Sequence, residues 1–98
     1  MKKIIILLFL LLCSKATFPQ WTALPGGTSN YLYSVYFPDA QTGYVVGEKG
    51  TILQTFTGGT TWSEILSGTT HTLFSVYFTD IKTGYSVGAG GIILKTTH

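Results

Sequence analysis

Four carboxylate side chains are spread along the chain, and paired carboxylates are the usual acid and base of glycoside hydrolysis. They are Asp39, Glu48, Glu64 and Asp80. Asp39 and Asp80 both stand in the pattern Phe-x-Asp-x-x-Thr-Gly. Because aspartate at the start of a turn accepts hydrogen bonds from backbone N–H groups two residues further on, we interpret both as turn caps. Glu48 falls in a predicted hairpin tip and Glu64 in a predicted outer strand, so we predict no carboxylate pair for general acid–base catalysis.

Histidine and serine give no better case for catalysis. His71 lies in a predicted connection and His98 is the last residue. Without cysteine or clustered carboxylates beside them, they predict no metal site. Ser34 and Ser75 recur at equivalent positions, but no histidine or aspartate is spaced to activate either hydroxyl, so we interpret both as small packing residues. The sequence therefore predicts a protein that is not an enzyme and needs neither a cofactor nor a metal.

A sequence repeat places these residues. Residues 21–57 align without a gap on residues 62–98, at a constant offset of 41 residues, and about half of the aligned pairs are identical. Trp21 matches Trp62, and Ser-Val-Tyr-Phe at 34–37 recurs at 75–78. A repeat of this length, rich in aromatic and β-branched residues, is typical of four-stranded propeller blades.

The repeat predicts the strands and their order. We expect strands at residues 32–37, 43–47, 51–55 and 61–65 in the first copy, and at 73–78, 84–88 and 92–96 in the second. Because residues 21–24 align with 62–65, we expect them to form the outermost strand of a preceding unit. The predicted fold class is all-β: two incomplete four-stranded blades of a β-propeller, at 21–61 and 62–98, the second lacking its last strand. An ordinary β-sandwich is the alternative, which the strict repeat disfavours.

Two blades alone would leave apolar faces and strand edges uncovered, and such edges invite pairing with other chains. The interpretation favoured here is a fragment of a larger propeller, because repeat units generally need three or more neighbours to be stable. Self-association through the open blade edges, to complete a ring, is a second expectation. A decayed remnant is the third.

The first residues differ from the rest in composition. Met1-Lys2-Lys3 is followed by the apolar run 4–12 and then by a more polar tail, which is the pattern of a secretory signal peptide. We predict a signal peptide at 1–16, cut after Ala16 or as late as Gln20, and a secreted, periplasmic or cell-surface protein. The apolar run is too short to span a membrane. Lipid anchoring at Cys13 is the alternative; the leucines directly before it argue against this, since lipoprotein signals carry a small residue there.

Charge excludes one class of partner. The whole chain has a formal charge of +2, but Lys2, Lys3 and Lys15 belong to the predicted leader. The remaining three lysines stand against four carboxylates, which leaves a charge of −1. No basic patch for nucleic acid is predicted.

One turn resembles a known motif. Residues 55–62, Thr-Phe-Thr-Gly-Gly-Thr-Thr-Trp, resemble the Asp-box of sialidase-type (BNR) repeats, Ser/Thr-x-Asp-x-Gly-x-Thr-Trp. Thr55, Gly59, Thr61 and Trp62 match, and Thr57 stands at the aspartate position. In the family this aspartate closes the hairpin by accepting backbone N–H bonds. The resemblance implies a structural turn that a threonine closes more weakly.

The wider repeat is similar to the blades of the photosystem II stability/assembly factor family, on the evidence of residues 43–53 with the turn that follows, and of 84–94. The resemblance implies a β-propeller that assists assembly of a photosynthetic complex, although similar repeats occur in secreted proteins without that role. We therefore predict a secreted, non-catalytic repeat module that binds protein or glycan, with Tyr31 and Tyr33 as a candidate binding rim.

The alternative is a fragment of a sialidase-type glycoside hydrolase whose catalytic residues lie outside this chain. Sialidases resemble one another in holding the substrate carboxylate with three arginines, a bidentate contact that lysine makes poorly. This chain contains no arginine. The sequence therefore favours the binding module over the hydrolase.

Overall fold

A computed structural model describes residues 19–97 of the chain. The predicted signal peptide and Cys13 lie outside the described residues. The described part forms two antiparallel sheets, in which each strand pairs with the strand before it in sequence. The first sheet contains β1 (Leu32–Tyr36), β2 (Gly43–Gly47), β3 (Ile52–Thr55) and β4 (Ser63–Ile65). The second contains β5 (Leu73–Phe78), β6 (Thr83–Gly88) and β7 (Ile93–Thr97).

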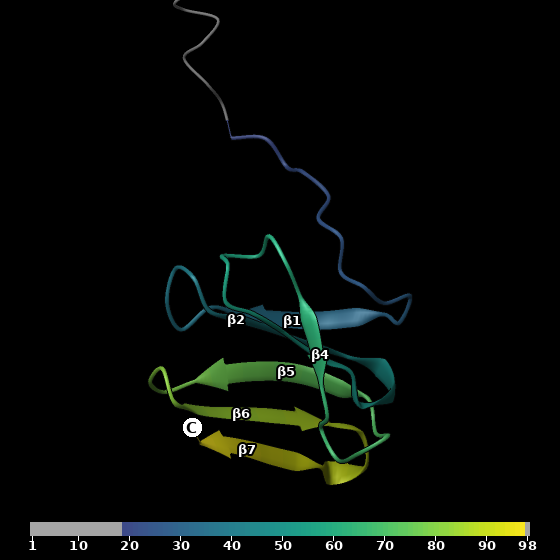
Figure 1. Ribbon diagram of the computed structural model, residues 1–98. Coiled ribbons are helices and arrows are strands. Elements are labelled where there is room, and N and C mark those ends of the chain that lie inside the picture. The colour runs from purple at the N-terminus through teal and green to yellow at the C-terminus, as the bar shows by residue number, and fades with distance from the viewer. Residues whose placement is uncertain (1–18, 98) are drawn as a thin grey trace, which may run out of the picture.

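The all-β fold class of two partial propeller blades is confirmed, with four strands in one sheet and three in the other. Figure 1 shows the second sheet lying beside the first, with β5 next to the layer formed by β1 and β2. The two sheets share a local irregularity. The pairing register shifts between Leu32 and Ser34 in β1, and between Leu73 and Ser75 in β5. The repeat in sequence is therefore also a repeat in backbone geometry.

Short 3-10 turns join the second and third strands of each sheet. They are η1 (Glu48–Gly50) and η2 (Ala89–Gly91). Gly50 and Gly91, which are equivalent in the repeat, both have positive φ, at 72° and 75°. Glycine reaches this left-handed region at no steric cost, and this allows the chain to reverse here within three residues.

The hydrophobic core lies between the two sheets. Its buried members come from β2 and β5 and are Tyr44, Val46, Leu73, Val76 and Phe78. The Tyr44 and Phe78 rings stack with centroids 4.4 Å apart. Burial of these apolar side chains is the main force that holds one sheet against the other, because the hydrophobic effect scales with the apolar area removed from water.

Residues 21–24, which were predicted to form the outermost strand of a preceding unit, are in no strand of the described structure. Residues 21–24 pair with no strand of either sheet, and the Trp21 side chain is fully exposed. A β-strand forms only where a neighbour supplies hydrogen bonds. The equivalent residues near Trp62 have such a neighbour, since β4 pairs with β3. Residues 21–24 carry the same sequence pattern without a strand beside them.

The two repeated aspartates close equivalent turns. Asp39 Oδ1 accepts hydrogen bonds from the backbone N–H of Thr42 at 2.7 Å and of Gln41 at 2.8 Å. These bonds hold the pKa of the Asp39 carboxyl below its ordinary value of 3.8. Asp80 repeats the arrangement, and the N–H groups of Lys82 and Thr83 lower its pKa in the same way. Both carboxylates are thus occupied in turns.

We expect these turns to make stability depend on acid. A carboxyl whose folded pKa is depressed stabilises the fold above its unfolded pKa, and this contribution is lost as the pH falls through the folded pKa. The free energy of unfolding, measured by urea titration from neutral pH to below 3.8, should therefore fall toward acid. The double variant Asp39→Asn, Asp80→Asn should show a shallower fall. An unaltered slope in the double variant would contradict the assignment.

Candidate binding site

The motif turn between β3 and β4 is closed by threonine hydroxyls. Thr55 Oγ1 accepts hydrogen bonds from the backbone N–H of Thr57 at 3.2 Å and of Gly59 at 3.1 Å. Thr57 Oγ1 accepts from the N–H of Thr61 at 2.9 Å and shares a hydrogen bond with the Thr61 hydroxyl at 2.9 Å. A neutral hydroxyl therefore sits where the motif carries a carboxylate, and it accepts a backbone bond across the turn.

The same turn carries the aromatic contact of the motif. Gly59 has a φ of 96°, a conformation that residues other than glycine rarely adopt. The Trp62 ring meets Phe37 edge-on, with centroids 6.0 Å apart. The three hydroxyls bond to one another or to the backbone. The geometry of this turn is that of a clamp joining β3 to β4, without a group aimed at a ligand.

Exposed aromatic rings gather along the first strands of the two sheets. Tyr33, near the start of β1, and Phe74, near the start of β5, face each other with ring centroids 5.5 Å apart. They occupy equivalent positions of the repeat, and about half of each side chain is exposed. Tyr31 stands just before β1, and its side chain is mostly exposed. Its backbone is fixed: the N–H donates to Glu48 Oε1 at 2.8 Å, and the carbonyl accepts from Glu48 N at 2.9 Å.

We call Tyr31, Tyr33 and Phe74 the aromatic rim. The structure brings Tyr33 together with Phe74, a residue outside the binding rim predicted from the sequence. The offset of 41 residues between them was the signal that could have found it. Neighbouring first strands place equivalent residues side by side, so a rim on one repeat continues on the next.

A second contact between the first strands was also missed. The Ser34 hydroxyl accepts a hydrogen bond from the backbone N–H of Val76 at 3.3 Å. Ser34 is therefore more than a small packing residue, because it satisfies a backbone donor across the two sheets. Ser75 does not repeat this contact in the described residues; its carbonyl accepts from the Ser86 hydroxyl at 2.8 Å.

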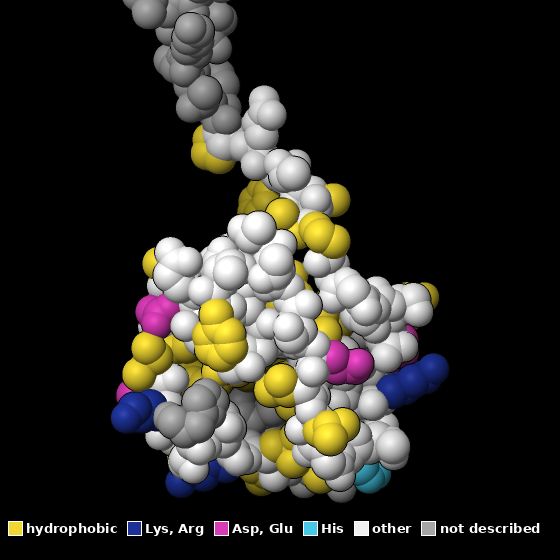
Figure 2. All heavy atoms as spheres, in the orientation of Figure 1, with side chains coloured by type: hydrophobic (Ala, Val, Ile, Leu, Met, Phe, Trp, Pro, Cys, Tyr) yellow, Lys and Arg dark blue, Asp and Glu magenta, His cyan; other side chains and the backbone are white. Residues whose placement is uncertain are grey.

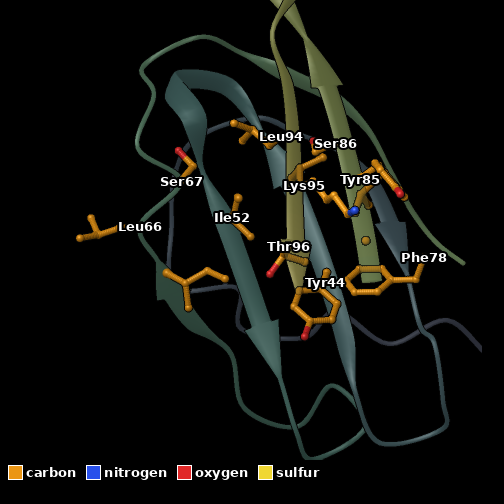
Figure 3. A pocket seen from close by; sticks show the side chains of 14 residues that line it. Tyr44, Ile52, Leu66, Ser67, Phe78, Tyr85, Ser86, Leu94, Lys95 and Thr96 are labelled. Carbon is orange, nitrogen blue, oxygen red and sulfur yellow. The ribbon is translucent and has the colours of Figure 1, made fainter. Parts of the chain in front are cut away.

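An apolar cleft of about 200 Å³ lies between the two sheets. Figure 3 shows the Tyr44 and Phe78 rings lying together at one end and Leu66 pointing away. Ile52, Leu94 and Ser86 are among the other residues that line it. Lys95 is the one charged residue among those that line the cleft, and its ammonium group lies over the Tyr85 ring. The cleft is the outer part of the contact between two blades, and its lining gives no chemical group for a reaction.

The described residues hold no group of three or more histidine, cysteine, aspartate or glutamate side chains that could bind a metal ion. Of their carboxylates, Asp39 and Asp80 cap turns, and Glu48 accepts from Tyr31. Within residues 19–97, no helix has the length and apolar character needed to cross a membrane. The aromatic rim is thus the feature of this part of the chain that best suits a ligand.

Comparison with known proteins gives a family and a structural relative. Residues 13–98 match the family described as Photosynthesis system II assembly factor YCF48. The solved structure "YCF48 bound to D1 peptide" is similar, with a TM-score of 0.74 and 29% sequence identity. The match covers 82% of this chain and 26% of that chain, so the present chain spans about a quarter of its relative's length. No curated protein matches.

Proposed function

Since the chain belongs to the family of the photosynthesis system II assembly factor YCF48, we propose that it binds a peptide segment of a partner protein and carries out no reaction on it. One observation carries the proposal: a solved relative at 29% identity is described as bound to D1 peptide. The repeat unit is shared, and the alignment covers most of this chain. The ligand of a repeat protein commonly lies across several equivalent units.

The aromatic rim is the proposed contact surface. Tyrosine and other aromatic residues are enriched among the residues that dominate binding energy, because they bury a large area at little cost in conformational entropy. Tyr33 and Phe74 lie close together on adjacent strands, and Tyr31 is held in place through its backbone. A peptide crossing the two first strands would contact all three rings.

Two finer statements belong to the proposal. A glycan could stack on the same rings, so it is the alternative ligand for this surface. Secretion rests on the composition of residues 1–16 alone, and we propose on that basis that the partner is met outside the cytoplasm. The described residues offer no observation in favour of the sialidase-type alternative.

The experiment uses a fluorescently labelled D1 peptide, of the sequence present in the related structure, as the probe. Fluorescence anisotropy should show saturable binding to the purified chain. Tyr33→Ala and Phe74→Ala should each weaken binding by about tenfold, since truncating a central aromatic contact costs more than about 1 kcal/mol. Phe56→Ala removes a ring that is even more exposed, from the turn after β3, and should leave binding unchanged.

Absence of saturable binding by the unaltered chain would overturn the proposal for this peptide. Binding that survives both rim variants would move the contact to another surface. Titration of the same protein with neutral oligosaccharides tests the glycan alternative. Saturable binding of a saccharide that is lost in Tyr33→Ala, without peptide binding, would replace the peptide by a sugar as the ligand of the rim.

A further inference from the structure

The outward face of the second sheet repeats the face that the first sheet buries. On the first sheet, Tyr44 and Val46 of β2 point toward the second sheet, and Val46 is 0% exposed. Their equivalents on β6 are Tyr85 and Val87, and Val87 is 44% exposed. Ile93 of β7, which is equivalent to Ile52, is 70% exposed. The second sheet therefore presents to solvent the same residue types that form the core one repeat earlier.

The outward face of the first sheet shows the opposite half of this contact. Leu73 and Val76 of β5 are 0% and 9% exposed because they pack on the first sheet. Their equivalents on β1 are Leu32 and Val35, which are 41% and 57% exposed. The described part of the chain thus carries one completed contact between sheets and the two unmatched halves of a second one.

Among the described residues, no strand pairs with the outer edge of β7. In the first sheet the third strand, β3, pairs with β4, and Ile52 lies opposite Ile65. Within residues 19–97 the second sheet has three strands, and β7 is the third. The segment equivalent to β4 is residues 21–24, which carry the same Trp-x-x-aliphatic pattern and pair with nothing in either sheet. In Figure 1 this part of the chain runs away from both sheets.

We propose that a second copy of this chain docks head-to-tail on the second sheet. Residues 21–24 of the incoming copy add to β7 as its fourth strand, and the first sheet of that copy stacks on Tyr85, Val87 and Ile93. The register follows from the first sheet, where Ile52 lies opposite Ile65 and Gln54 opposite Ser63. It places Leu24 opposite Ile93 and Thr22 opposite Lys95.

The connection length supports this occupant. Within the chain, 41 residues separate each position of the first sheet from its equivalent in the second, and the same spacing links residues 21–24 to residues 62–65. An incoming copy can therefore use the same geometry. Its residues 21–24 would take the position relative to β7 that Trp62–Ile65 take relative to β3, and its first sheet would stack on the second sheet as the second sheet stacks on the first. Trp21 would meet the edge of Phe78 as Trp62 meets Phe37.

One charged side chain lies on the open face. Lys95 Nζ sits 5.8 Å from the centroid of the Tyr85 ring. Its equivalent on the first sheet, Gln54, is half-buried and donates to the Tyr44 hydroxyl at 2.8 Å. Lys95 lies on β7, the last described strand of the sheet. Its aliphatic stem can therefore cover apolar surface while its ammonium group stays in water. The face can therefore be covered without burying the charge.

Because the two docking surfaces differ, the contact is heterologous and leads to rings or open chains of copies. The test uses two charge variants at positions that are more than half exposed. Val35→Lys blocks the outward face of the first sheet, and Ile93→Lys blocks that of the second. In sedimentation velocity the unaltered chain should form oligomers whose size grows with concentration, and each variant alone should be monomeric. An equimolar mixture of the two should form a 1:1 dimer, because each retains the face that the other lacks.

Ile81→Lys changes an exposed apolar residue in the β5–β6 loop and should assemble like the unaltered chain. Trp21→Asp alters a fully exposed side chain outside both sheets, so loss of assembly in this variant cannot be ascribed to unfolding. A monomeric unaltered chain would overturn the proposal, as would a mixture that stays monomeric while both variants keep their β-sheet circular dichroism. Association driven by the apolar residues 4–12 would persist in every variant, and that result would also overturn it.

Discussion

Leu73→Ala lowers the free energy of unfolding by about 2–5 kcal/mol, the range for removing a fully buried leucine side chain from a packed core. Leu73 is completely buried between the sheets, where it belongs to the core with Val46, Val76 and the Tyr44 and Phe78 rings. Truncation to alanine loses the transfer free energy of the removed atoms and leaves a cavity that the surrounding strands can fill only partly. The effect is read from urea unfolding monitored by tryptophan fluorescence.

The repeat supplies the matched control. Leu32 is the equivalent residue of β1, and its side chain is 41% exposed. The same substitution of leucine by alanine can therefore be compared at a buried and at an exposed site. At protein concentrations low enough for the chain to be monomeric, Leu32→Ala should cost about 1 kcal/mol or less, as is usual for residues outside a packed core. Equal losses at the two positions would contradict the asymmetry between the covered and the open sheet faces.

A second large effect is expected at Gly50. Alanine at this position meets two obstacles: the left-handed φ of 72°, and a Cβ that would overlap the backbone carbonyl oxygen of Thr69. The first costs about 1–2 kcal/mol for a residue with a side chain. Overpacking against atoms that cannot move away adds about 1–3 kcal/mol. Gly50→Ala should therefore lower the free energy of unfolding by about 2–5 kcal/mol in the same urea experiment.

Gly91→Ala separates these two causes. Gly91 occupies the equivalent place in η2 and has nearly the same φ, 75°, but no atom lies within 4 Å of a Cβ built there. Its replacement should cost only the backbone term of about 1–2 kcal/mol. If both variants lost the same stability, the close approach of Thr69 to η1 would carry no energetic weight.

Much of the fold could be predicted because the sequence pattern of most strands occurs in both copies of the repeat. Gly43, Tyr44 and Val46 have counterparts in Gly84, Tyr85 and Val87, and a pattern seen at two places is harder to misassign than a single apolar run. The Asp39 and Asp80 turns followed from local chemistry, since an aspartate bonds to backbone only a few residues away. Local hydrogen bonding and strand pairing between sequence neighbours are both visible in sequence.

What could not be predicted depends on a neighbour in space. Trp21 and Trp62 share one sequence context, yet only the second precedes a strand that has a partner. The Ser34 hydroxyl bonds to the backbone of Val76, and Tyr33 pairs with Phe74. These contacts arise from the docking of one sheet on the other. The periodicity of a single sequence predicts strands, but it does not predict which side chains meet when two sheets pack together. The aromatic rim was therefore found only in part.

The order of the strands has a kinetic consequence. In both sheets every ladder joins strands that follow one another along the chain, through short turns such as η1 and η2. Closing short loops costs little entropy, and chains rich in sequence-local contacts fold fast. The event that brings distant segments together is the arrival of β5 on β1 and β2. Each sheet can therefore assemble by itself while the polypeptide is still emerging, and the collision of two preformed layers is left as the step that limits the rate.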